Sequence, residues 1–189
     1  YNDVNESLAL VNQDLSNEQL SEVFFELASS HPGVTSLNLS FNQLDEDSAS
    51  MLSTYLPSLP NLVDLNLSGN DEIDDPGLAS LSHALSESSS ITSSNFSSCD
   101  IVEGIILFDN LFASSRVINN ISLANNNLGD EGADLIFTAL SRNTRSALED
   151  LNLSDNNLTG AAIINSVSPY LNRQNPITSL DLSFNEIDN

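Results

Sequence analysis

The sequence contains no lysine, and its 189 residues include only four arginines against 27 acidic residues, which gives a formal net charge of −23. Binding to a nucleic-acid backbone depends on Lys and Arg, so this composition argues against nucleic acid as a partner. Attachment to an anionic membrane surface is disfavoured for the same reason. A negative field instead speeds encounter with basic molecules, so a basic protein is a candidate partner.

Cysteine is nearly absent, since Cys99 is the only one in the chain. A single cysteine excludes an internal disulfide framework and a zinc site built from several cysteines. The longest apolar run, at 101–112, is too short to cross a bilayer, so we expect no membrane insertion. His31 and His83 have no spaced partner, and no phosphate loop or nucleophile motif occurs. We therefore predict no metal, no cofactor and no catalysis.

One phrase, L-x-L-x-x-N-x-L, does recur along the whole chain. Its copies are LALVNQDL (8–15), LNLSFNQL (37–44), LNLSGNDEI (65–73), SNFSSCDI (94–101), ISLANNNL (121–128), LNLSDNNL (151–158) and LDLSFNEI (180–187). The Asn position advances by 27 to 30 residues each time, and is occupied in turn by Gln13, Asn42, Asn70, Cys99, Asn126, Asn156 and Asn185. A regular period of this length indicates a repeat architecture.

The phrase and its period resemble the leucine-rich repeat family, and the long period with a helix in each unit resembles its ribonuclease-inhibitor-like type. The resemblance implies an α/β fold, a leucine-rich repeat solenoid in which a curved right-handed β-α superhelix has parallel strands on its concave side and helices on its convex side. We predict a single domain over 1–189 of about seven units. Because the sequence stops after a strand and has no paired-cysteine caps, we expect a segment of a longer chain or assembly.

The residues themselves predict the same arrangement. Alternation in Leu37-Asn38-Leu39 places the leucines on one face of a short strand. The Asn at the end of each phrase is expected to turn its amide inward and bond backbone groups, which the weakly bonding thiol of Cys99 cannot do as well. After the Asn, apolar residues follow helical spacing, as at Ile136 and Leu140.

The outward strand positions form the surface that this family most often uses to bind proteins, so we predict a non-enzymatic interaction module or scaffold that binds a protein partner there. The candidate residues are Ser36, Asn38, Ser40, Phe41, Asp64, Asn66, Ser68, Ser93, Asn95, Ser97, Asn120, Ser122, Asp150, Asn152, Asp155, Ser179, Asp181 and Phe184. Phe41 and Phe184 are the expected anchors, because aromatic residues concentrate binding energy. Two alternatives stay open: the Ser and Asn residues are ordinary solvent-facing positions of the repeat, and the two rings fold over the loop edge.

The fourth unit departs from its relatives, with Ser94 where they have leucine and Cys99 where they have asparagine. One interpretation is that the bulky segment 101–112 fills the space left by the small Ser94. The other is that Ile106 and Leu107 form an apolar contact patch on the convex side.

Two further functions remain open from the sequence. Ran GTPase-activating proteins share this repeat type, so Arg116, Arg142, Arg145 or Arg173 acting as a finger would make the chain a GTPase-activating regulator. The second is a structural or adhesion subunit of an extracellular or lumenal complex. Seven N-x-S/T sequons occur, but four of them arise from the repeat phrase itself. The repeat type and the lack of disulfide caps favour a cytoplasmic location.

Acidic residues gather after the Asn positions, at 45–47, 71–75 and 130–131. They are interpreted either as a negative rim for a basic partner or as helix N-terminal residues that bond free N–H groups and complement the helix dipole. Their spacing lacks the pattern of a calcium-binding loop.

Overall fold

The computed structural model describes residues 6–73, 75–102 and 109–187. Its strands are β1 (Glu6–Ala9), β2 (Val34–Asn38), β3 (Asp64–Asn66), β4 (Ser93–Asn95), β5 (Asn120–Ser122), β6 (Asp150–Asn152) and β7 (Ser179–Asp181). The α-helices between them are α1 (Asn17–Ser30), α2 (Glu46–Tyr55), α3 (Asp75–Glu87), α4 (Asp109–Ser114), α5 (Gly129–Arg142), α6 (Gly160–Ala162) and α7 (Ser168–Leu171). A π-helical turn, Ile163–Val167, joins α6 to α7, and a 3-10 turn, Leu56–Ser58, follows α2.

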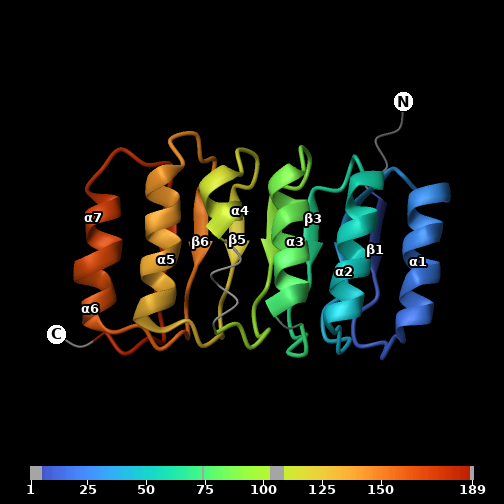
Figure 1. The fold of residues 1–189 in the computed structure, drawn as a ribbon, viewed down its shortest axis with the longest axis horizontal. Coiled ribbons are helices and arrows are strands. Elements are labelled where there is room, and N and C mark those ends of the chain that lie inside the picture. Colours follow the sequence, from blue (N-terminus) through green and yellow to red (C-terminus); the bar gives the residue numbers. More distant parts are fainter. Residues whose placement is uncertain (1–5, 74, 103–108, 188–189) are drawn as a thin grey trace.

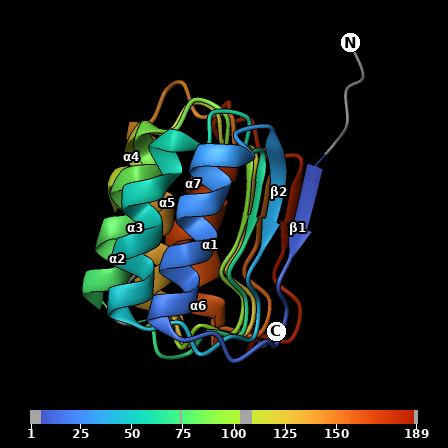
Figure 2. The same cartoon turned by 90° about the vertical axis from the view of Figure 1, so that its right-hand side faces the viewer.

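The strands form one sheet in chain order, β1 to β7, and every neighbouring pair is parallel. The register keeps equivalent repeat positions side by side, so that Leu37 pairs with Leu65 and Leu151 with Leu180. Figure 1 shows the helices standing next to one another in the same order in front of the strands. Figure 2, turned by 90°, shows the two layers, with strands on one side and helices on the other. The α/β solenoid expected from the repeat is confirmed.

The core lies between these two layers. Leu37 and Leu39 of the second repeat are fully buried, as are the corresponding Leu65 and Leu67 of the third. The predicted helical stripe is also correct, because Ile136 and the other apolar residues of α5 on that side are buried. The strand leucines of the inner repeats lie between the repeats before and after them, so burial depends on stacking.

A ladder of inward asparagine side chains holds successive repeats together. Oδ1 of Asn70 accepts hydrogen bonds from the backbone N–H groups of Asn42 (2.9 Å) and Leu44 (3.0 Å) in the preceding repeat. Its Nδ2 donates to the carbonyl groups of Leu39 (3.1 Å) and Leu67 (2.7 Å). Asn126 is bonded in the same way to the fourth repeat. The inward amide predicted from the sequence is therefore confirmed.

The fourth repeat interrupts this ladder. The Sγ atom of Cys99 lies 3.4 Å from the carbonyl oxygen of Leu67, a weak hydrogen bond in place of the amide contacts. Burial raises the pKa of the Cys99 thiol to about 11, and a backbone hydrogen bond from Asn70 opposes the rise only in part. The thiol therefore stays protonated at neutral pH and is a packing group rather than a nucleophile.

Ser94 is the second departure in that repeat. It pairs with Leu65 on one side and Ile121 on the other, and its side chain is only 1% exposed. Its hydroxyl has no hydrogen-bond partner among the described residues. Whether the segment 101–112 fills the space beside Ser94 depends on residues 103–108, which lie outside the described ranges.

Candidate protein-binding face

The outward side chains of β2 to β7 and of the residues that directly follow these strands form one surface, which we call the strand face. Side chains of equivalent positions stand in register across it. One row begins with Ser36, Asp64 and Ser93, and the next begins with Asn38, Asn66 and Asn95. Most of the candidate residues are half-buried, whereas Phe41, Asn120, Asp155, Ser179, Asp181 and Phe184 are exposed. The sheet therefore brings the predicted residues together on one side of the molecule.

The asparagines of the strand face have fixed orientations. Oδ1 of Asn38 accepts a hydrogen bond from the backbone N–H of Ser40 (3.0 Å), and Oδ1 of Asn66 accepts the same bond from the backbone N–H of Ser68 (3.0 Å). The corresponding amides of Asn95 and Asn152 accept in the same way. Each amide thereby keeps its Nδ2 donors for solvent or a partner, because no protein acceptor for Nδ2 occurs in the described part of the chain. The result is a row of preorganised hydrogen-bond donors.

Four aspartates give the strand face its charge: Asp64, Asp150, Asp155 and Asp181. Hydrogen bonds from Ser183 hold the pKa of Asp181 below its ordinary value of 3.8, so this carboxylate is ionised at neutral pH. Asp64 accepts a hydrogen bond from the Ser36 hydroxyl at 3.2 Å. None of the chain's four arginines lies on this surface, so its charge is purely negative.

Phe41 and Phe184 occupy the same repeat position, in the turns that follow β2 and β7. Their side chains are 56% and 86% exposed. Both adopt the left-handed backbone conformation, with φ of 59° and 58°. The other repeats place residues suited to that conformation there, such as Gly69 and Asn125. A left-handed backbone is unfavourable for phenylalanine, so neither ring is explained by a local conformational preference.

The Phe41 ring does not stand free on all sides. A Cβ atom added to Gly69 would lie 2.3 Å from Cδ1 of Phe41, so the ring rests directly on the glycine of the next repeat. The expectation that the ring folds over the loop edge is thus partly met for Phe41. The contact fixes the ring in place and leaves its outer face open to a partner.

Ser40 is a correction to the predicted site. Its side chain is only 3% exposed, and the corresponding Ser154 is buried as well. The chain has already left the sheet at this position and turns toward the helices, because the next residue, Phe41 or Asp155, has a positive φ. The backbone N–H of each serine donates to Oδ1 of the asparagine two residues earlier, Asn38 or Asn152, and the Ser154 hydroxyl also donates to Oδ1 of Asn152 at 2.7 Å. They do not belong to the binding face.

Two residues of the face were missed in the sequence. Ser98 and Asn125 occupy the same repeat position as Phe41, and Nδ2 of Asn125 donates to Oγ of Ser98 at 2.8 Å. The phase of the repeat would have identified them. The other predicted patch, Ile106 and Leu107, lies outside the described residues.

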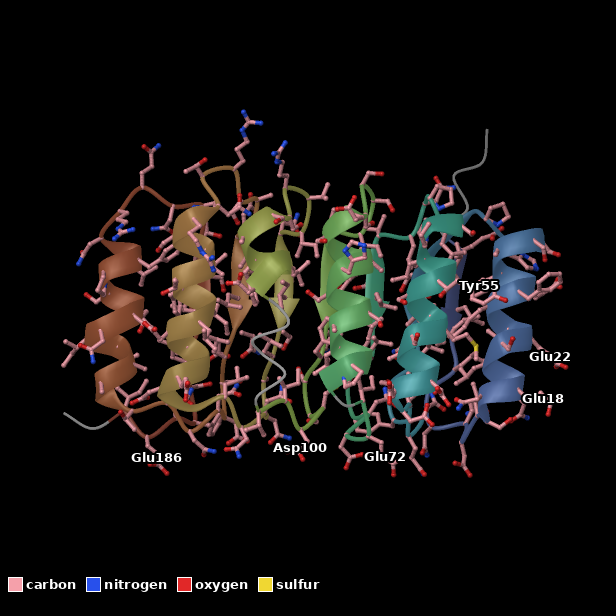
Figure 3. The ribbon with its side chains drawn as sticks, in the orientation of Figure 1. Glu18, Glu22, Tyr55, Glu72, Asp100 and Glu186 are labelled. Carbon is pink, nitrogen blue, oxygen red and sulfur yellow. The ribbon has the colours of Figure 1, made fainter. Side chains whose placement is uncertain are left out.

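The long edges of the solenoid differ in charge. The edge where strands lead into helices is acidic, and Figure 3 shows Glu18, Glu72, Asp100 and Glu186 along it. Asp45 is the N-cap of α2, where its carboxylate accepts a hydrogen bond from the backbone N–H of Ser48 (2.9 Å). The capping interpretation is confirmed at this helix, while the exposed carboxylates still form a negative rim.

The opposite edge, where helices lead into the next strands, carries the arginines. We call it the arginine edge: Arg116, Arg142, Arg145 and Arg173. Arg142 forms an ion pair with Asp109, and the other three have no ion pair within the described ranges.

No group of three or more His, Cys, Asp or Glu side chains among the described residues is placed to hold a metal ion. Within the same ranges, no helix has the length and apolar character needed to cross a membrane.

The parallel sheet, the helical layer and the in-register outer face define a repeat protein of the β-α solenoid class. Leucine-rich repeat profiles match residues 32–53, 58–82, 116–137, 147–167 and 174–189. The chain belongs to the leucine-rich repeat family, and its repeats are of the ribonuclease-inhibitor-like type. Members of this family commonly bind proteins and are typically non-catalytic. No curated protein sequence matches the chain.

Several solved structures share the fold. The leucine-rich repeat-containing protein LegL7 from Legionella pneumophila is 25% identical, with a TM-score of 0.60, over 94% of this chain and 56% of that one. Leiomodin-1 actin-binding site 2 is 19% identical, with a TM-score of 0.59, over 75% and 83% of the two chains. A Bacteroides fragilis protein is 17% identical, with a TM-score of 0.54, over 84% and 43%. This chain therefore spans little more than half of LegL7.

Proposed function

We propose that the chain is a protein-interaction module that binds a protein partner through the strand face, without catalysis. The observation that carries the proposal is the row of oriented asparagine amides between two exposed phenylalanines. The amides are held by their own backbone bonds, so little side-chain entropy is lost when a partner accepts their Nδ2 donors. Phe41 and Phe184 supply apolar anchors at separate points of the same face.

The partner that fits this face is basic. Asp64, Asp150, Asp155 and Asp181 face outward with no arginine among them, and the acidic edge adjoins the ends of the same strands. Aligned negative charge raises the rate of encounter with a positive surface and fixes its orientation more than it adds to the final affinity. Binding is therefore expected to slow markedly as salt rises, because exposed charges are screened beyond about 8 Å at physiological ionic strength.

The experiment compares two arginine variants in the same repeat. Asn120 is exposed on β5 of the strand face, and Thr138 is exposed on α5 in the helical layer. Asn120→Arg and Thr138→Arg make the same change of charge and size on opposite layers of one repeat. Proteins retained from an extract by the immobilised parent chain are identified, purified and titrated against both variants.

The proposal predicts that Thr138→Arg binds the partner like the parent and that Asn120→Arg binds at least about tenfold more weakly. A partner that binds Asn120→Arg normally and Thr138→Arg poorly would move the interface to the helices. Equal circular dichroism spectra for the three chains exclude misfolding as the cause.

A further inference from the structure

A groove of about 600 Å³ opens on the arginine edge, between the connection from α5 to β6 and the connection from α7 to β7. Leu140, Pro176 and the ring of Tyr170 give it an apolar floor. Ser141, Thr144, Arg173 and Gln174 are its main polar walls. The groove lies at the opposite ends of the strands from the acidic edge, so it is independent of the proposed strand-face function.

Two asparagines hold the walls of this groove in fixed positions. Nδ2 of Asn143 donates to the carbonyl groups of Phe112 (3.0 Å) and Ser115 (2.7 Å), while its Oδ1 accepts from the backbone N–H of Arg145. Nδ2 of Asn175 donates to the carbonyl of Arg173 (2.9 Å), and its Oδ1 accepts from the backbone N–H of Ile177. Both connections are thus preorganised by their own hydrogen bonds, so a ligand would not have to order them.

Tyr170 lines the groove with a hydroxyl group that has no hydrogen-bond partner among the described residues. It is only 4% exposed and packs against Phe137, with the ring centroids 5.4 Å apart. This unbonded hydroxyl is not one of the fully buried side-chain atoms, so it is accessible from the groove. Burial raises the pKa of Tyr170, so the hydroxyl remains a donor at neutral pH. Since Tyr170 lines the groove, the group available to satisfy its hydroxyl is a ligand or water there.

The charge of the groove is opposite to that of the protein. Arg173 is exposed on its wall and has no ion pair among the described residues, in a chain with 27 acidic residues. No aspartate or glutamate is among the described residues that line it. The hydroxyl groups of Ser141 and Thr144 and the amide of Gln174 also make no hydrogen bond within the described ranges. The lining therefore offers one cation and several donors over an apolar floor.

We propose that this groove binds an oxyanion, a carboxylate or a phosphate, carried on a small apolar body. The guanidinium of Arg173 pairs with the anionic oxygens, the Tyr170 hydroxyl donates to one of them, and the apolar body rests on Leu140 and Pro176. Hydrogen bonds to a charged group are about twice as strong as neutral ones, so both contacts contribute to recognition.

The test uses benzoate, phenyl phosphate and neutral benzamide as probes of one ring size. Since the chain has four arginines and no lysine, its Nε–Hε signals are few enough to follow individually in an NMR titration at pH 7 and about 0.1 M salt. Arg173 is expected to shift saturably with benzoate, with phenyl phosphate or with both, and not with benzamide. Benzoate and phenyl phosphate distinguish a carboxylate ligand from a phosphate.

Three variants complete the test. Arg173→Gln, followed through the backbone amide signals of Thr144 and Gln174 in the same groove, abolishes binding, and Tyr170→Phe, which keeps the ring, weakens it by about tenfold or more. Arg116→Gln removes the same charge from the same edge outside the groove and leaves binding unchanged. Linear shifts of similar size at Arg116 and Arg173, or unchanged binding by Tyr170→Phe, would overturn the proposal.

Discussion

Replacing Asn70 with alanine tests what holds one repeat to the next. The Asn70 side chain is fully buried and contacts four backbone groups. Alanine removes its Oδ1, which is the acceptor for the N–H groups of Asn42 and Leu44. It also removes Nδ2, but the carbonyls of Leu39 and Leu67 keep bonds from Asn42 and Cys99. The lasting damage is therefore two buried N–H groups without an acceptor.

Each unsatisfied buried group costs about 1–3 kcal/mol, so two of them are expected to lower the free energy of unfolding of Asn70→Ala by about 2–6 kcal/mol. A domain has only about 5–15 kcal/mol in total, so the effect is large. Cys99→Ala is the matched control, because Cys99 occupies the same repeat position and is equally buried but makes only weak hydrogen bonds. Its expected cost is about 1 kcal/mol, mainly from lost packing.

Urea unfolding followed by circular dichroism measures both changes, provided that the slopes of the transitions agree. The account requires a clearly lower midpoint for Asn70→Ala than for Cys99→Ala. Equal midpoints would show that hydrogen bonds from the inward amides do not hold successive repeats together.

Three further predictions follow from single residues. Ser94→Ala removes a buried hydroxyl without a partner and should raise the free energy of unfolding by about 1 kcal/mol, measured by urea unfolding; a loss of stability would mean that the hydroxyl is bonded. The backbone N–H of Ser48 donates to the Asp45 carboxylate and lowers the pKa of Asp45 below its ordinary value of 3.8. The ionised carboxylate therefore stabilises the fold above pH 3.8, and this stabilisation is lost as the pH falls through the lower folded-state pKa. Asp45→Ala should therefore cost about 1 kcal/mol at pH 7, and the gap from the parent should close in acid; a constant gap would contradict this. Asparagine suits the left-handed backbone at position 41, so the free energy of unfolding of Phe41→Asn should lie within about 1 kcal/mol of the parent value. Phe41→Asn should bind the partner at least tenfold more weakly, whereas Phe25→Asn on α1 should leave binding unchanged.

The sequence predicted the fold because its information is periodic. Leucines such as Leu37 and Leu65 recur in phase, and each repeat can bury them only by stacking on the next. The inward role of Asn70 was also predictable, since an amide at a strand end has few other ways to satisfy the backbone. These conclusions depend on positions within one repeat, and they hold wherever the repeat keeps its leucine and asparagine, as the fourth repeat with Ser94 and Cys99 does not.

The site was less predictable because it depends on neighbours in other repeats. Alternation along the strand placed Ser40 outside, but the turn at Phe41 takes it into the interior. The contact between Phe41 and Gly69 joins two repeats and leaves no local signal. The groove beside Tyr170 is likewise formed by two connections about 30 residues apart. One signal was available: a phenylalanine stands where other repeats have the small or polar residues Asn, Gly, Ser or Asp.

Hydroxyl-radical footprinting of the chain with its bound partner shows whether the strand face or the helical layer is the interface. Phe25, Phe41 and Phe184 are all well exposed, at 63%, 56% and 86%, and so all react in the free chain. Phe41 and Phe184 lie on the strand face, whereas Phe25 lies on α1 in the helical layer. The account predicts that the partner protects Phe41 and Phe184 and leaves Phe25 fully reactive. Protection of Phe25 with unchanged reactivity at the other two rings would contradict it.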